Sequence, residues 1–191
     1  SRHLTEYWHA EMEMAWCRFE DVQDHAEDLL KHVVSHVCDE YQEELERVGR
    51  SPADLQATRE EPFPRMTYTE ALELLKEECD VDVRWGEDLG RHEETALTKL
   101  YDKPIIVTDY PKEAKAFYMK ETPGNSDAVQ GCDVLAPEGY GEIVGGSQRE
   151  EDIEEIKSRL REEGEDPDDY DFYLDTRRYG SVPHGGFGLG V

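Results

Sequence analysis

The chain has 191 residues and a formal net charge of −26, because 47 aspartates and glutamates outnumber 21 lysines and arginines. This balance argues against broad nucleic-acid contact through the segment, since phosphate binding needs clustered cations. No membrane-length apolar run and no C-x-x-C pair occur, so we expect neither membrane contact nor a zinc or redox motif, but a cytoplasmic protein with reduced thiols. The acidic residues are spread along the chain, which favours adaptation to high salt over a disordered tail.

Residues 7–16 alternate with a period of two, which predicts a β-strand. The apolar face, expected to pack on a core, consists of Met12, Met14 and Trp16. The opposite face consists of Tyr7, His9, Glu11 and Glu13. This second face is either plain solvent-facing surface or the wall of a polar pocket.

Residues 19–48 form the longest predicted helix, with Gly49 as its C-terminal cap. Its apolar stripe consists of Val22, Ala26, Leu29, Leu30, Val33, Val37, Tyr41 and Leu45. His32 and His36 are four residues apart, as two metal ligands on one helix face would be. No third ligand is spaced to join them, so a polar helix flank is the better interpretation.

The remaining elements follow a linker with three prolines at residues 51–64. Thr67 and Glu70 form a capping box that opens a short helix. Further helices are expected at residues 90–101, 149–163 and 168–179, strands at 103–108, 116–120, 132–135 and 142–144, and a turn at 121–127. Strand runs interrupted by unequal helices indicate an α+β fold with a mostly antiparallel sheet flanked by helices.

A glycine-rich run at residues 139–149 carries Glu142 near one end and Arg149 at the other. Glycine lets the backbone approach a ligand closely, because no Cβ stands in the way. A strand that only packed would not give up so many side chains. The run therefore indicates either the floor of a ligand site or a tight hairpin.

Three stretches, in order, resemble one family. Residues 2–7 (RHLTEY) followed by Glu11 resemble the distal half of motif 2 of class II aminoacyl-tRNA synthetases. Residues 141–149 resemble the amino-acid-site strand of the aspartyl/asparaginyl branch, and residues 185–190 resemble the start of motif 3. The resemblance implies one partial catalytic domain over residues 1–191, of class II fold and incomplete at both ends.

The resemblance also implies ATP-dependent activation of an amino acid to an adenylate, followed by transfer to tRNA. Such catalysis rests on positioning and charge neutralisation, and no catalytic nucleophile is needed. The implied ATP-binding residues are Arg2, His3, Leu4, Tyr7, Glu142, Gly188 and Gly190. Asp133 and Glu142 would hold Mg²⁺, which prefers hard oxygen ligands. The alternative is that neither binds a ligand, and that Asp133 is a carboxylate at the end of a turn and Glu142 an acid on the surface.

The implied amino-acid-binding residues are Glu11, Gly145, Arg149 and Gly185. The Arg149 guanidinium would hold the side-chain oxygen of aspartate or asparagine; otherwise it is a helix-start arginine paired with a neighbouring acid. Glu11 would accept a hydrogen bond from the amide of asparagine and repel aspartate; otherwise it is ordinary strand polarity. The resemblance is therefore closest to the asparaginyl branch, with asparagine and tRNA(Asn) as substrates.

Three alternatives stay open: an ammonia-dependent asparagine synthetase of the same branch, an aspartyl-tRNA synthetase, and a non-catalytic binding module derived from a synthetase. By comparison with the family, the chain begins inside the motif 2 loop and stops before the Glu-Arg of motif 3. We therefore expect a fragment that alone lacks ATP–pyrophosphate exchange. Its homodimer would form through the missing motif 1, and tRNA would contact mainly other regions.

Overall fold

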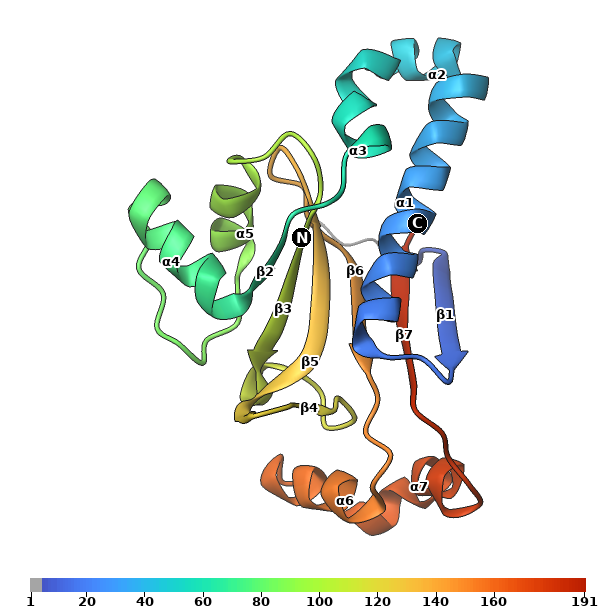
Figure 1. Cartoon of the computed structure of the whole chain (residues 1–191), viewed down its shortest axis with the longest axis vertical. Coiled ribbons are helices and arrows are strands. Elements are labelled where there is room, and N and C mark those ends of the chain that lie inside the picture. The colour runs from blue at the N-terminus through green and yellow to red at the C-terminus, as the bar shows by residue number, and fades with distance from the viewer. Residues whose placement is uncertain (1–4) are drawn as a thin grey trace.

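A computed structural model describes residues 5–191, which fold around one seven-stranded sheet (Figure 1). The strand order is β1-β7-β6-β5-β3-β2, with β4 paired to β5. All neighbours are antiparallel except β2 and β3. The strands are β1 His9–Ala15, β2 Arg65–Thr67, β3 Ile105–Pro111, β4 Glu121–Thr122, β5 Asn125–Ala136, β6 Gly141–Gln148 and β7 His184–Gly190. The mostly antiparallel α+β fold predicted from the sequence is confirmed.

The helices lie on both faces of the sheet and beyond its lower end as Figure 1 is drawn. They are α1 Phe19–Glu40, α2 Gln42–Arg47, α3 Gln56–Glu60, α4 Tyr68–Cys79, α5 Arg91–Thr98, α6 Ile153–Glu162 and α7 Asp171–Arg178. Short 3₁₀ turns occupy Pro52–Leu55, Lys112–Ala114 and Pro167–Tyr170. Within the described part of the chain, no helix is both long and apolar enough to cross a bilayer.

Helix α1 covers one face of the sheet. Val22 and Ala26 are fully buried in a cluster with Val134, Val144 and Phe187. Met12 and Met14 of β1 pack against this cluster, as their alternation predicts. Because this face is closed by α1, a ligand must approach the sheet from the other side.

Helices α4 and α5 cover only part of that other side. Leu75 and Leu97 pack there against Ile105, Val107 and Leu135 of β3 and β5. These strand residues lie at the end of the sheet where β2 and β3 pair. The described helices thus leave β5, β6, β7 and β1 open to a cavity on this face.

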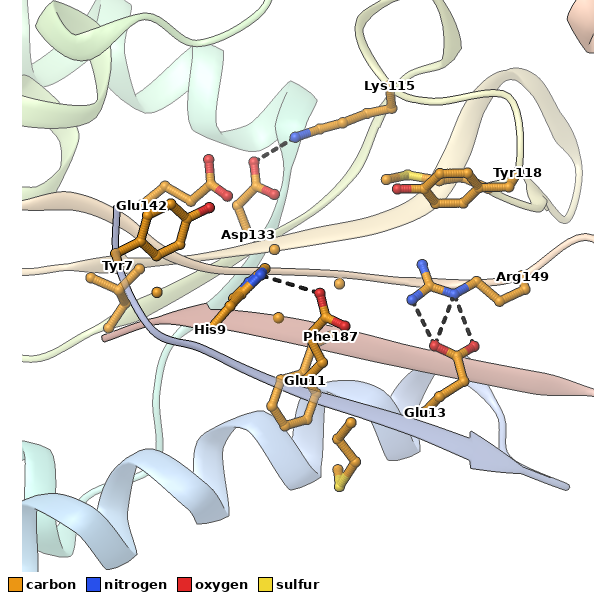
Figure 2. A pocket seen from close by; sticks show the side chains of 17 residues that line it. Tyr7, His9, Glu11, Glu13, Lys115, Tyr118, Asp133, Glu142, Arg149 and Phe187 are labelled. Carbon is orange, nitrogen blue, oxygen red and sulfur yellow. Dashed lines mark hydrogen bonds and ion pairs between the residues drawn. The ribbon is translucent and has the colours of Figure 1, made fainter. Parts of the chain in front are cut away.

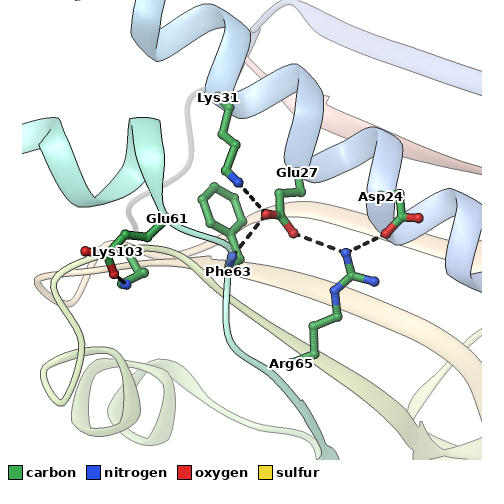
Figure 3. Close-up of polar contacts among 7 residues, drawn as sticks. All are labelled: Asp24, Glu27, Lys31, Glu61, Phe63, Arg65 and Lys103. Atoms are coloured by element: carbon green, nitrogen blue, oxygen red, sulfur yellow. Dashed lines mark hydrogen bonds and ion pairs between the residues drawn. The ribbon is translucent and has the colours of Figure 1, made fainter.

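A buried carboxylate ties α1 to the chain that enters β2 (Figure 3). Glu27 accepts hydrogen bonds from Lys31 Nζ (2.7 Å), the Phe63 backbone N–H (3.1 Å) and Arg65 Nη2 (3.1 Å). Arg65 also donates to Asp24 at 2.6 Å. Burial alone would raise the pKa of Glu27, but these hydrogen bonds outweigh it and lower the pKa.

Several predicted elements differ from the structure at their ends. The long helix breaks at Tyr41, whose backbone (φ −126°, ψ 40°) is not helical. Trp16 lies outside β1 with φ 61° and is 77 % exposed, so its assignment to the core-facing side is wrong. The predicted 51–64 linker contains a 3₁₀ turn and α3. The Thr67 capping box is confirmed, with Glu70 N–H donating to the hydroxyl at 3.2 Å.

The largest error concerns residues 116–127. The predicted strand 116–120 is an irregular segment with a single bridge between Met119 and Arg149, and the predicted turn holds β4 and the start of β5. The strands predicted at 132–135 and 142–144 extend over Asn125–Ala136 and Gly141–Gln148. The helix expected from residue 149 begins at Ile153, because Asp152 caps it by accepting from the Glu154 N–H at 2.8 Å.

Candidate active site

A cavity of about 680 Å³ opens on the uncovered face of the sheet (Figure 2). Ligand pockets for small molecules occupy roughly 300–1,000 Å³, so the volume suits a small substrate. Its labelled lining side chains are Tyr7, His9, Glu11, Glu13, Lys115, Tyr118, Asp133, Glu142, Arg149 and Phe187. The polar face of the first strand is therefore the wall of a pocket, one of the two possibilities that the sequence left open.

Glycines form the floor of the cavity. Gly145 of β6 pairs with Gly188 of β7 across the sheet, and both line the cavity with Gly190. A Cβ on Gly188 would overlap the His9 imidazole, and one on Gly190 would lie 3.7 Å from Tyr7 Cε2. His9 of β1 and Tyr7, which precedes that strand, thus place their rings over bare backbone. Most of the glycine-rich run at residues 139–149 belongs to the central strand β6, which supports the floor interpretation, while residues 139 and 140 lie in the tight turn that joins β5 to β6 as a hairpin.

Two carboxylates point over the floor from adjacent strands. A Cβ on Gly145 would lie 2.9 Å from Glu142 Oε1 and 3.8 Å from Asp133 Oδ1. Burial raises the pKa of Asp133, although the nearby Lys115 ammonium opposes that rise. Burial of the Glu142 carboxyl and the charge of Asp133 raise the pKa of Glu142 to about 7, even though Glu142 as a residue is exposed. A nearby cation would stabilise the ionised forms of two carboxylates that lie this close together.

The donor set fits a hard divalent cation, because both carboxylates offer oxygen to one space above Gly145. Among residues 5–191, no three His, Cys, Asp or Glu side chains are arranged to hold a metal ion. The remaining ligands of a Mg²⁺ ion there would come from phosphate oxygens and water. The same observation leaves the His32/His36 pair on α1 without a third ligand in this part of the chain.

Arg149 closes the other end of the cavity. Its Nε lies 3.0 Å from Glu13 Oε1 and its Nη2 lies 2.8 Å from Glu13 Oε2. Nη1 donates to the Ser147 hydroxyl, and the guanidinium lies 5.2 Å from the centre of the Tyr118 ring. Burial disfavours the charged guanidinium, but the bonds to Glu13 outweigh it and raise the pKa of Arg149. One edge of the guanidinium is therefore fixed by protein.

Glu11 and Arg149 line the same cavity, as the predicted asparagine site requires. Each of the two side chains has a different charged neighbour: Arg149 pairs with Glu13, and Glu11 Oε1 lies 3.2 Å from His9 Nδ1. Figure 2 shows Glu11 between His9 and Glu13 along β1. The expected acid and base therefore line one cavity, and Glu13, a second acid on the same strand face, holds the guanidinium.

The other predicted site residues fall into three groups. Arg2, His3 and Leu4 lie outside the described residues. The cavity brings together Tyr7, Glu11, Asp133, Glu142, Gly145, Arg149, Gly188 and Gly190. Gly185 is not among the lining residues, and a Cβ there would lie 2.8 Å from Val22 Cγ2 on the α1 side. Its placement gives no support to a ligand contact.

Sequence reasoning did not assign site roles to Glu13 and Lys115. Glu13 carried a signal, because it shares a strand face with Glu11. Lys115 carried none, since it precedes a segment wrongly predicted as a strand and reaches Asp133 only through the fold, at 2.6 Å.

The whole chain, residues 1–191, matches the family model described as tRNA synthetases class II (D, K and N). The asparagine–tRNA ligase of Pyrococcus furiosus is 50 % identical over 190 residues, which cover 100 % of this chain and 43 % of that protein. This chain belongs to the class II tRNA synthetases. The matches to solved structures agree with the family and with the fold described above.

Asparaginyl-tRNA synthetase from Pyrococcus horikoshii superposes with a TM-score of 0.94 at 50 % identity, over 98 % of this chain and 44 % of that one. Its complex with asparaginyl-adenylate gives the same TM-score of 0.94, at 50 % identity over 99 % and 43 % of the two chains. An aspartyl-tRNA synthetase from Entamoeba histolytica gives 0.86 at 27 % identity, over 99 % and 39 %. This class II chain spans less than half the length of these relatives.

Proposed function

We propose that the chain is the amino-acid-activating part of an asparagine–tRNA ligase. ATP and asparagine would give asparaginyl-adenylate and pyrophosphate, and the asparaginyl group would then pass to tRNA(Asn). The observation that carries the proposal is Arg149, held by Glu13, in one glycine-floored cavity with Glu11. The 50 % identity to asparagine–tRNA ligases supports the same choice.

In the first step a carboxylate oxygen of asparagine attacks the α-phosphorus of ATP, a P–O bond forms, and the bond to pyrophosphate breaks. The chain need supply only orientation and charge for this displacement. Tyr7, beside Gly190 at one end of the cavity, offers a ring on which adenine can stack. The glycine floor lets the phosphates and the α-carboxylate lie directly on the backbone.

Asp133 and Glu142 would hold the Mg²⁺ ion that the class uses with ATP. When bound, this ion neutralises charge on the phosphate oxygens. The support is the shared space of the two carboxylates above Gly145 and the raised pKa of Glu142, which a cation would offset.

The charges around Arg149 favour a neutral amide over a carboxylate. Glu13 compensates the guanidinium, and Glu11 adds a further negative charge, so the subsite is negative before ligand binds. The amide of asparagine can donate to Glu11 and accept from the guanidinium. An aspartate side chain would meet Glu11 with like charge and without a donor.

The test is ATP–pyrophosphate exchange by the complete protein with asparagine, with aspartate, and with aspartate plus ammonia. Exchange with asparagine should be fastest, and Glu11→Gln should reduce that preference because the glutamine amide no longer repels aspartate. Glu6→Gln, a change at an exposed neighbouring acid, is the matched control. Faster exchange with aspartate than with asparagine would indicate an aspartyl-tRNA synthetase. Formation of free asparagine from aspartate and ammonia would indicate the ammonia-dependent asparagine synthetase. The absence of exchange with any of these substrates would indicate a non-catalytic binding module.

We also propose a homodimer that works in the cytoplasm at high salt and contacts tRNA mainly through other parts of the protein. The net charge of −26 supports work at high salt, because salt screens the repulsion among the carboxylates. It also supports tRNA contact through other parts of the protein, because tRNA phosphates are negatively charged. A melting temperature that does not rise between low and molar KCl would refute the salt adaptation, and a monomeric mass in light scattering would refute the dimer.

A further inference from the structure

A buried ammonium group lies beside the two carboxylates above Gly145. Lys115 Nζ is 2.6 Å from Asp133 Oδ2, and the two side chains are 13 % and 10 % exposed. Lys115 follows the 3₁₀ turn Lys112–Ala114, so it reaches the cavity from outside the sheet. Figure 2 shows its ammonium group pointing toward the Asp133 carboxylate.

The surroundings of Lys115 keep it charged and in place. Its Nζ lies 4.0 Å from the centre of the buried Tyr110 ring, a distance at which a cation and an aromatic face attract. Burial disfavours the ammonium, but Asp133 outweighs burial and raises the pKa of Lys115, with smaller contributions from Asp88 and Glu142. The negative groups that act on this ammonium are therefore those around the carboxylate pair.

The ammonium changes what a metal ion would meet. Lys115 engages Oδ2 of Asp133, while Oδ1 and Glu142 Oε1 face the space above Gly145. When both carboxylates are ionised, they and the ammonium carry a net charge of −1, where the carboxylates alone would carry −2. A divalent cation arriving without nucleotide thus finds few ligands and a cation close by. An ion that arrives on ATP brings phosphate oxygens and their negative charge with it.

We propose that Lys115 is a positioning residue that weakens binding of a free divalent cation to Asp133 and Glu142, so that the metal is loaded together with the nucleotide. The proposal rests on the proposed use of ATP and a metal. A purely structural ion pair would hold the chain after β3 against β5 without changing metal affinity in this direction.

The experiment measures Mn²⁺ binding to the complete protein without nucleotide, by the electron paramagnetic resonance signal of free Mn²⁺. Lys115→Met should bind Mn²⁺ at least about tenfold more tightly than the unaltered protein, since a like charge is removed. Adding Asp133→Asn to this variant should abolish the gain. Lys115→Arg, which keeps the charge, should retain weak binding.

Lys112→Met is the matched control, because Lys112 belongs to the same turn but lies 3.5 Å from Glu162 and 3.8 Å from Glu121. Its Mn²⁺ affinity should not change. If Lys115→Met does not fold, Lys115→Gln retains an N–H donor for Asp133 and replaces it in the comparison. Circular dichroism with and without Mn²⁺ verifies the fold of each variant.

Unchanged or weaker Mn²⁺ binding by a folded Lys115 variant would overturn the proposal. So would equal tightening in Lys115→Arg, because the effect would then not depend on charge. The readout needs no amino acid, so failure of asparagine activation would refute the proposed function and leave this result unaffected.

Discussion

Replacing Glu13 by glutamine would test whether this side chain fixes Arg149 for substrate. Each Glu13 oxygen accepts from the guanidinium, at 3.0 Å from Nε and 2.8 Å from Nη2. Glutamine keeps one acceptor and turns an NH₂ group toward the second N–H. The guanidinium would lose its fixed edge and its compensating charge together.

The expected magnitude follows from the exposure of the pair. Removing one partner of a fully buried ion pair costs about 3–5 kcal/mol, whereas exposed pairs contribute about 0–1 kcal/mol. The Arg149 side chain is 17 % exposed and that of Glu13 49 %. We therefore expect a cost of about 1–2 kcal/mol, and since about 1.4 kcal/mol is a factor of ten, the KM for asparagine should rise roughly tenfold.

The assay is ATP–pyrophosphate exchange by the complete protein, with asparagine and ATP varied separately. The KM for asparagine should rise and that for ATP should stay within about twofold, because Arg149 is far along the cavity from Tyr7 (Figure 2). Glu151→Gln is the matched control, since Glu151 pairs with Lys120 at 3.1 Å and does not line the cavity. An unchanged KM for asparagine, or equal rises for both substrates, would refute the reasoning.

Three further changes have defined outcomes. Gly145→Ala places a Cβ 2.9 Å from Glu142 Oε1, so the KM for ATP should rise about tenfold, or about 1.4 kcal/mol, in the same exchange assay; an unchanged value would contradict the shared floor. Gly186→Ala would drive a Cβ into the Met12 carbonyl oxygen, and urea unfolding should show a loss of about 1–3 kcal/mol. Glu27→Gln should lose about 3 kcal/mol at pH 7, because the side chain is 9 % exposed and ion-paired. The folded-state pKa of Glu27 is lowered, so this contribution is complete above its unfolded pKa of about 4.3 and is lost as pH falls through the folded pKa. Unfolding curves for the variant that keep the full acid dependence would contradict this assignment.

Local patterns predicted the regular elements well where one physical cause dominates. The alternation at Met12 and Met14 correctly placed one face of β1 on the core, and the Thr67 capping box correctly opened α4. Trp16 continued the alternation in sequence but not in space, because the chain turns there with φ 61°. A period of two carries no information about where a strand stops.

The site was predicted in part for a similar reason. Residues on the glycine strands could be assigned, because motif spacing and the lack of Cβ atoms both indicate a ligand floor. Lys115 could not, since nothing near it in sequence marks an irregular segment whose side chain reaches β5. Glu13 was recognised as polar, but only the register of β1 on β7 brings it to Arg149.

Glu13 and Arg149, which pair at one end of the cavity, are 136 positions apart in the sequence. Strand β7 lies between β1, which carries Glu13, and β6, which ends just before Arg149. At a synthesis rate of about 5–20 residues per second, the first leaves the ribosome on the order of 10 s before the second. Within residues 5–191, β1 pairs with β7 alone, so this pairing forms only after β7 has been made. The contact between Glu13 and Arg149 is therefore among the last of the described cavity to form during synthesis, because it requires β7 as well as β6.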